Sequence, residues 1–183
     1  MHKKMFITSD FHLGHKNIIK HTNRPYSSIE EMDDDIITKW NSTVKDTDMV
    51  LFLGDFIMSH RIDLAYNYLS KLNGLIYIVP GNHDKWTTKY LDTFKQSKVA
   101  ICGGYKELKY NGVLLVLCHY PLLSWNNMRH GSIMLHGHSH GTYDSLNKGT
   151  RRLDVGWDAK FDGVNPNYRL LSLDEIVDKL KKQ

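Results

Sequence analysis

Five short apolar runs constrain the fold of this chain more than any other feature of its sequence. Each run is four to six residues long, and helical patterns separate the runs. Short apolar runs that alternate with helical segments are typical of an α/β protein. The strands that we expect are Met5–Thr8, Met49–Leu53, Leu75–Val79, Val113–Cys118 and Ser132–Leu135.

Three other segments have a helical pattern. We expect helices from Ser28 to about Trp40, from Asp63 to Lys71, and from Ser172 to about Leu180. The first and the third begin with Ser-x-x-Glu, which is the sequence of a capping box. In this motif the serine and the glutamate satisfy backbone N–H groups at the start of the helix.

A hairpin signal lies in the second half of the sequence. Tyr105–Tyr110 and Val113–Cys118 are separated by Asn111-Gly112, a dipeptide that favours a tight turn between antiparallel strands. Arg151–Val155 and Tyr168–Leu171 add two further strands. The first half is therefore predicted to be parallel and the second half largely antiparallel. These elements predict an α/β fold, a two-sheet mixed β-sandwich flanked by helices, in one domain over residues 1–183.

The composition excludes several other classes of protein. Its 41% hydrophobic and 24% charged residues indicate neither disorder nor a fibrous repeat. No apolar segment is long enough for a signal peptide or a membrane span, so we expect a cytoplasmic protein with no membrane partner. The net charge of +4 is mild and does not by itself indicate nucleic-acid binding. Cys102 and Cys118 end apolar runs and are predicted to be core thiols.

Carboxylate, amide and imidazole side chains follow the expected strands, each just past the C-terminal end of a strand. In open α/β sheets ligands bind at that edge. The residues concerned are Asp10, His12, Asp55, Asn82, His83, Asp84, His119, His138 and His140. Five strands that end in this way favour a common functional site.

The residue types in this series suit a divalent metal. Carboxylate oxygens, neutral imidazole nitrogens and an amide oxygen match Mn²⁺, Fe²⁺, Zn²⁺ or Ni²⁺. Asp10 and His12 are two residues apart, so in an extended segment both side chains would point to one side, and His138 and His140 share that spacing. Glycines beside these residues would allow close backbone approach, and they are Gly54, Gly81 and Gly137.

Each fragment of the series taken alone is more typical of ordinary structure than of a site. Asp-x-His and Gly-Asp are common, and Gly-Asn-His-Asp fits a turn because Asn and Gly favour turns. A segment with three nearby histidines also forms weak adventitious metal sites. The order of the fragments at successive strand ends is what favours function over these alternatives.

The complete series resembles the motif set of the calcineurin-like metallophosphoesterases. The resemblance rests on Asp10-x-His12, Gly54-Asp55, Gly81-Asn82-His83-Asp84, His119 and Gly137-His138-Ser139-His140, and it spans residues 10–140. The segment Ser9–Ile18 also resembles a small bacterial and phage subgroup of that family. The resemblance implies an αββα fold and the hydrolysis of phosphate esters.

The resemblance also implies a role for each residue of the series. Asp10, His12 and His140 would bind one divalent metal, Asn82, His119 and His138 would bind a second, and Asp55 would bridge the two. Mn²⁺ is the expected metal, with Fe²⁺, Zn²⁺ or Ni²⁺ as alternatives. A hydroxide that bridges the metals would attack phosphorus, with His83 as the general acid. Asp84 would orient the His83 imidazole.

The sequence favours a phosphodiester substrate because the expected site is compact and open. A phosphomonoesterase acting on nucleotides or small molecules is the alternative, and a non-catalytic metal-binding scaffold is a third reading. Nucleotides are candidate substrates, whereas nucleic acid and the oligomeric state stay undecided. The segment Gly54–Ser59 lacks the Gly-Asp-x-x-Asp-Arg-Gly pattern, which argues against a Ser/Thr protein phosphatase.

Several other residues have weaker signals. His15 could reach the substrate side of the site, although a surface position is equally expected. His136 precedes the ligand pair and is predicted to support it or to lie in the core. Arg24, Arg61 and Arg129 could contact a substrate phosphate, although surface positions are expected for them. Trp125 and Trp157 could stack on a base, although packing is expected.

Overall fold

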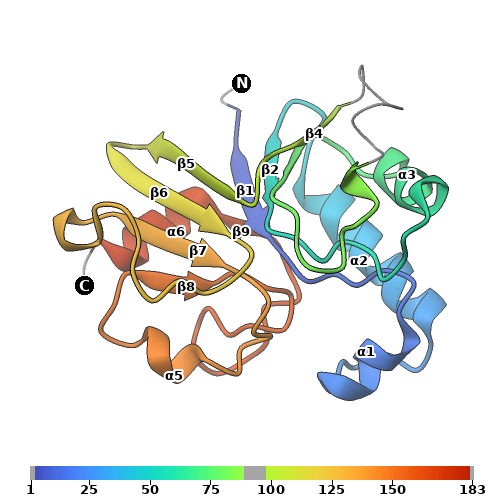
Figure 1. Cartoon of the computed structure of the whole chain (residues 1–183). Coiled ribbons are helices and arrows are strands. Elements are labelled where there is room, and N and C mark those ends of the chain that lie inside the picture. The colour runs from blue at the N-terminus through green and yellow to red at the C-terminus, as the bar shows by residue number, and fades with distance from the viewer. Residues whose placement is uncertain (1–2, 89–97, 182–183) are drawn as a thin grey trace.

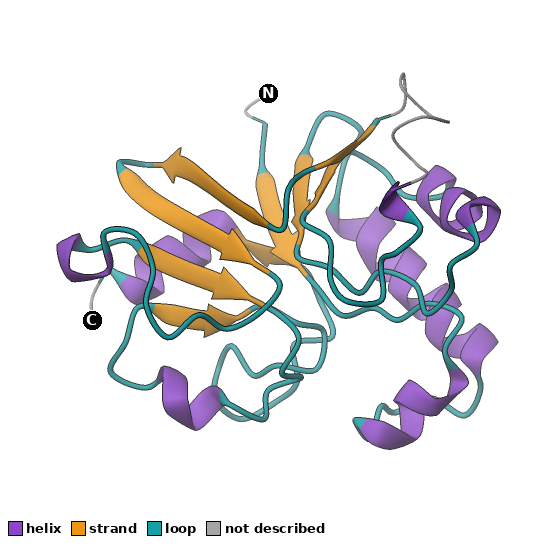
Figure 2. Ribbon diagram, in the orientation of Figure 1, coloured by secondary structure: helices purple, strands orange, loops and turns teal. Residues whose placement is uncertain are grey.

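The protein contains two β-sheets that pack against each other, with helices on the outside. The computed structural model describes residues 3–88 and 98–181. In Figures 1 and 2 helices α2 (Ile29–Thr43) and α3 (Ile62–Ser70) lie on the far side of the first sheet from the second sheet. The predicted α/β sandwich of two mixed sheets flanked by helices is confirmed.

The first sheet has the strand order β4-β3-β2-β1-β9. Its strands are β1 (Met5–Thr8), β2 (Met49–Phe52), β3 (Leu75–Ile78), β4 (Val99–Ile101) and β9 (Leu171–Ser172). Strands β1 to β4 are parallel to one another, and β9 pairs antiparallel with β1. The predicted strand Tyr168–Leu171 is wrong except at Leu171, because Tyr168 has a left-handed backbone, with φ of 39°.

The second sheet has the strand order β5-β6-β7-β8. Its strands are β5 (Tyr105–Tyr110), β6 (Val113–Cys118), β7 (Ile133–His136) and β8 (Arg152–Asp154). The predicted hairpin between β5 and β6 is confirmed, and the φ angles of Asn111 (48°) and Gly112 (77°) are both positive, as a type I′ turn requires.

The prediction that the second half is largely antiparallel is wrong. Strand β7 is parallel to both β6 and β8. Residues 119–132 form a first crossover loop between β6 and β7, and residues 137–151 form a second between β7 and β8. Each is long enough to return the chain to the starting edge of the sheet, as a parallel connection requires.

Alternating side chains divide the interior into two large cores. Along β2, Val50 and Phe52 pack against α2 and α3, while Leu51 faces the second sheet. From the second sheet, Leu115 and Leu135 meet Leu51 in the core between the sheets. Because side chains alternate along a strand with a period of two, successive residues face opposite sides of the sheet. Apolar residues at both kinds of position keep both cores apolar.

Helix α6 (Leu173–Leu180) closes the core between the sheets and has the predicted capping box. Ser172 accepts a hydrogen bond from the Glu175 backbone, and the Glu175 carboxylate accepts one from the Ser172 backbone. At α2 only half of the box forms, since Glu31 bonds Ser27 instead of the Ser28 backbone. The short helices α1 (Lys16–His21) and α5 (Asp144–Asn147) were not predicted.

Two further predictions concern the cysteines and the membrane. Cys118 is buried and Cys102 is half-buried, and both are free thiols. Within residues 3–88 and 98–181, no helix combines the length and the apolar character that a bilayer crossing demands.

Replacing Ser172 with alanine should weaken the C-terminal helix. We expect Ser172→Ala to lower the free energy of unfolding by about 1 kcal/mol, because it removes the side-chain acceptor of the capping box. Urea unfolding followed by circular dichroism would measure the change. Ser145→Ala, at an exposed position of α5, is the control and should change stability by less than about 0.5 kcal/mol. Equal effects of the two substitutions would contradict the capping role.

Candidate metal centre

The loops that follow the strands of both sheets meet in one place. A Cβ atom built on Gly81, after β3, would lie 2.3 Å from Asp55 Oδ1, and one on Gly137, after β7, would lie 2.5 Å from Asp10 Oδ2. Only glycine allows approaches this close. The predicted role of the glycines in bringing the loops together is therefore confirmed at both positions.

Six of the predicted ligands form two groups whose donor atoms lie close enough to hold a metal ion. Asp10, His12 and His140 form one group, and Asp55, His119 and His138 form the other, with the donor atoms of each group within 4.8 Å of one another. Each group combines residues that follow strands of the first sheet with residues that follow strands of the second.

Asp55 lies between the two groups. Its Oδ2 atom is 3.4 Å from Nε2 of His119 and 3.7 Å from Nε2 of His12. The seventh predicted ligand, Asn82, places its Oδ1 atom 3.2 Å from Nε2 of His119. The structure thus brings all seven predicted ligands together, with Asp55 in the position that a bridging carboxylate would need.

Hydrogen bonds orient two of the imidazoles. Nδ1 of His119 lies 2.7 Å from the Leu53 carbonyl oxygen, and Nδ1 of His140 lies 2.7 Å from Oδ2 of Asp158. With a metal bound, a proton on Nδ1 would satisfy each contact and leave Nε2 free to coordinate the ion. Metal-binding histidines are commonly fixed in this way.

The environment of His12 fits a bound cation. Both of its ring nitrogens are buried, and neither has a hydrogen-bond partner among residues 3–88 and 98–181. A buried polar atom without a partner is costly, and a metal ion held with Asp10 and His140 would satisfy one of these nitrogens. The donor set of carboxylates, imidazoles and an amide also matches a borderline divalent cation. On both counts the residues fit the implied metals.

Five of the seven residues have a left-handed backbone, which corrects the expectation of extended segments. The φ angles are 61° at Asp10, 52° at His12, 58° at Asp55, 68° at His138 and 46° at His140. The side chains therefore converge because the loops coil tightly. Such conformations are uncommon outside glycine and cluster at functional sites.

Arg24 is buried at the centre, so its predicted surface position is wrong. Its side chain donates to the carbonyl oxygens of Asp10 and Phe11, both at 2.7 Å, and forms two 2.8 Å hydrogen bonds with the Asp158 carboxylate. Because Asp158 also contacts His140, this ion pair links the loop after β1 to a ligand from the second sheet.

Asp158 is a residue that the sequence reasoning missed. Like the predicted ligands, it follows an expected strand and a glycine, in Val155-Gly156-Trp157-Asp158. That signal could have identified it. Arg24, in contrast, stands alone in a loop, and nothing in its sequence context distinguishes it from a surface arginine.

Asp84 has different partners from those predicted. Its buried carboxylate accepts hydrogen bonds from the backbone N–H groups of Asp55 (2.6 Å), Gly81 (2.9 Å) and Phe56 (3.0 Å), and from the indole N–H of Trp86 (3.1 Å). These contacts hold the Asp55 loop against the Gly81 loop. Asp84 therefore positions Asp55, and the predicted contact that would orient His83 is not among these hydrogen bonds.

His83 stands at the open side of the centre. Its backbone N–H donates to Oδ1 of Asp55 at 3.0 Å, and its Nε2 atom lies 4.0 Å from Oδ2 of the same carboxylate. The side chain is 35% exposed, whereas that of Asp55 is 3% exposed. The imidazole can therefore meet both solvent and the candidate metal ligands.

Burial and local charge set the ionisation of the centre. Burial lowers the pKa of His12 to about 3 and raises the pKa of Asp10 to about 7. Burial also acts to raise the pKa of Asp55, but the hydrogen bond and the charge of His119 outweigh it and lower that pKa to about 2. At neutral pH His12 is thus neutral and Asp55 is ionised, which are the forms that bind cations.

Other residues flank the centre. His15 is half-buried, with its ring centroid 5.9 Å from that of His12, and His136 is fully buried, as one of its two readings predicted. Tyr120, which the sequence reasoning missed, is exposed and has its ring centroid 4.7 Å from that of His138.

The predicted packing of Trp125 and Trp157 and the surface position of Arg61 are confirmed.

Asp158→Asn should weaken metal binding without removing a predicted ligand. The substitution removes the charge that orients His140 and pairs with Arg24, so we expect metal affinity to fall by about 10- to 100-fold. Competition with a fluorescent chelator would measure this affinity. Asp178→Asn, on the exposed face of α6, should leave it unchanged. Unaltered affinity in a folded Asp158→Asn protein would show that Asp158 does not support the site.

Comparison with known proteins adds relatives of similar length. An uncharacterized protein of Methanocaldococcus jannaschii is 35% identical over 185 residues, which cover 98% of this chain and 93% of that protein. The Gene 66 protein of Mycobacterium phage L5 is 27% identical over 205 residues, which cover 94% of this chain and 92% of that protein.

A solved structure supports the same fold. A protein of unknown function from Aquifex aeolicus superposes with a TM-score of 0.72 at 22% identity, covering 98% of this chain and all of the other. Residues 3–177 match the calcineurin-like phosphoesterase family. The chain therefore belongs to the calcineurin-like phosphoesterases and is a metal-dependent hydrolase of phosphate esters.

Proposed function

We propose that this protein hydrolyses phosphodiesters at a centre of two divalent metals. The observation that carries the proposal is the position of Asp55 between two groups of candidate ligands, next to the half-exposed His83. Carboxylate-bridged pairs of divalent ions are used by enzymes that displace groups at phosphorus.

We assign one metal to Asp10, His12 and His140, the other to Asn82, His119 and His138, and Asp55 to both. When bound, such a pair supplies Lewis acidity, which offsets the charge of the phosphate and lowers the pKa of a water molecule. Mn²⁺ is the metal that we expect, because four imidazoles favour it over Mg²⁺.

His83 is the residue that we assign to proton donation. Its backbone N–H donates to Asp55, which places the partly exposed imidazole beside the ligands, with Nε2 4.0 Å from the Asp55 carboxylate. A proton delivered from Nε2 to the departing oxygen would prevent an alkoxide from forming. General acids of this kind contribute about 10²- to 10⁴-fold in rate.

An open approach supports a diester over a monoester. Asn82 and His138 are exposed, so the second ligand group faces solvent. A diester carries two substituents on phosphorus, and both need space beyond the phosphate itself. The exposed side of the second group offers such space, whereas Asp10 and His12 of the first group are buried.

Metal removal tests the class of the enzyme. We expect chelator-treated protein to regain more activity with Mn²⁺ than with Mg²⁺, and to hydrolyse a bis-aryl phosphate faster than a mono-aryl phosphate. Turnover of both esters with each metal would be measured. Faster hydrolysis of the monoester would reassign the protein as a phosphomonoesterase, and no turnover with any metal would favour a non-catalytic scaffold.

Loss of His83 should affect poor leaving groups most. His83→Ala should keep both metals and lose about 10²-fold or more of its activity toward an alkyl ester, because an alkoxide needs the proton. Its activity toward a nitrophenyl ester should fall distinctly less, since nitrophenolate leaves without protonation. Turnover numbers for both esters, together with metal content, provide the measurement.

His119→Ala is the matched comparison for this experiment. It removes a proposed ligand, so metal content and activity toward both esters should fall together. Equal losses on the two esters for His83→Ala, with its metals intact, would rule out proton donation and leave phosphate binding as its role. Loss of metal from that variant would make His83 a ligand.

A further inference from the structure

The two crossover loops meet again at the end of the second sheet opposite the metal centre. The first loop leaves β6 at His119 and reaches β7 through Gly131, and the second carries His138 and His140 and reaches β8 through Arg151. Because β6, β7 and β8 are parallel, Gly131 and Arg151 lie at the N-terminal ends of their strands. Arg151 Nη1 donates to the Gly131 carbonyl oxygen at 3.1 Å, which joins the loops.

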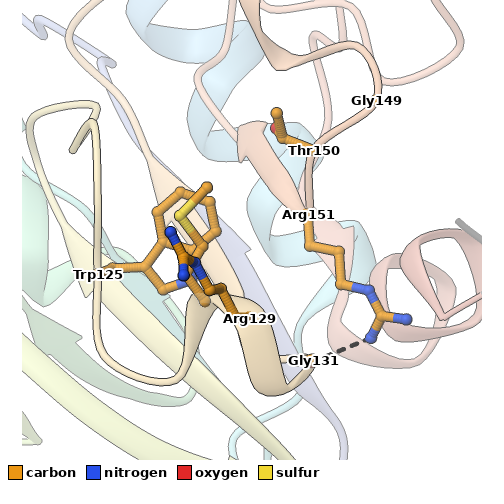
Figure 3. Close-up of a pocket in the computed structure, with 7 residues that line it drawn as sticks. Trp125, Arg129, Gly131, Gly149, Thr150 and Arg151 are labelled. Carbon is orange, nitrogen blue, oxygen red and sulfur yellow. Dashed lines mark hydrogen bonds between the residues drawn. The ribbon is translucent and has the colours of Figure 1, made fainter.

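A hollow of about 280 Å³ lies between the loops at this junction. Figure 3 shows Trp125 and Arg129 on one side of it and Arg151 on the other, with Gly131 between them. Its volume is near the lower end of that of small-molecule sites, which begin at roughly 300 Å³. A phosphate or carboxylate on a small organic group is a ligand of matching size.

The loops around this hollow are almost free of acidic residues. From residue 119 to residue 153 the sequence contains one carboxylate, Asp144, and it does not line the hollow. Glu107 of β5 reaches the first loop at Asn126, at 3.1 Å, but it does not line the hollow either. The lining therefore carries two positive charges and no negative one.

The arginines of the hollow also differ from the others in their partners. Over the described residues, Arg24, Arg61 and Arg169 form ion pairs with carboxylates. Arg152 donates to Asn147 and to the carbonyl oxygens of Leu122 and Leu146. Over the same residues Arg129 and Arg151 make no such ion pair, and of their side-chain N–H groups only those on Nη1 of Arg151 have a hydrogen-bond partner there.

We propose that this hollow binds an oxyanion, a phosphate or carboxylate carried on a small organic group, between Arg129 and Arg151. The guanidinium fork matches both kinds of oxyanion, and it binds them through paired N–H groups. Trp125 forms a fixed wall, since it is 9% exposed and its indole N–H donates to Ser132 Oγ at 3.0 Å. The site is separate from the metal centre.

The indole N–H of Trp125 provides a local probe of binding. The ¹H–¹⁵N spectrum of the zinc-loaded full chain would be followed during titration with sodium phosphate, adenosine monophosphate, sodium acetate and, as a salt control, sodium chloride. Trp125→Phe identifies the signal. We expect phosphate or acetate, but not chloride, to shift the Trp125 signal until it saturates. The readout needs no turnover, so it is independent of the proposed phosphodiesterase activity.

Substitutions separate this site from anion binding at the metals. Arg129→Ala should weaken the binding that the saturating shift reports at least tenfold, because it removes one of the two guanidinium groups that line the hollow. Arg151→Lys keeps the positive charge and should weaken anion binding less than Arg129→Ala does. Arg61→Ala, at the exposed residue that precedes α3, should leave the shift unchanged.

The outcomes decide the proposal. Saturation with phosphate and adenosine monophosphate alone identifies a phosphate ligand, and saturation with acetate alone identifies a carboxylate. A shift that is linear for every salt overturns the proposal. A saturating shift that survives Arg129→Ala unchanged also overturns it, because the anion would then be acting from the metal centre.

Discussion

The metal centre depends on one buried ion pair, that between Arg24 and Asp158. The guanidinium holds the carbonyl oxygens of Asp10 and Phe11, while the carboxylate fixes His140. A single charged contact thus sets both the coiled backbone after β1 and the orientation of a ligand from the other sheet. Breaking a buried pair by removing one partner leaves an uncompensated charge, which typically costs about 3–5 kcal/mol. The geometry of the centre is therefore tied to the stability of the fold around it.

The sequence predicted the local features of the fold and site but not the contacts between distant segments. Strands such as Val113–Cys118 and the ligand series follow from patterns a few residues long. The support by Arg24, the contacts of Asp84 with the Asp55 loop and the parallel pairing of β7 depend on residues that meet only after folding. The extent of the single domain, residues 1–183, stays a prediction.

The crossover loops explain why the second sheet is parallel and how it contributes to the centre. Each loop begins beside a strand end that carries candidate ligands and runs back along the sheet to the opposite end. Trp125 packs on the outer face of that sheet with Val116 and Met134, so the first loop is anchored along its path. Ligand residues on such anchored loops are held more firmly than residues on free surface loops would be.

The division of each ligand group between the two sheets has a thermodynamic consequence. An ion bound by Asp10 and His140, or by Asp55 and His119, ties together two layers that are otherwise joined mainly by apolar packing. The metal then acts as a clamp across the sandwich. Because the clamp exists only in the folded state, unfolding must release the ion, and the melting temperature should rise with the logarithm of free metal concentration once the sites are nearly saturated.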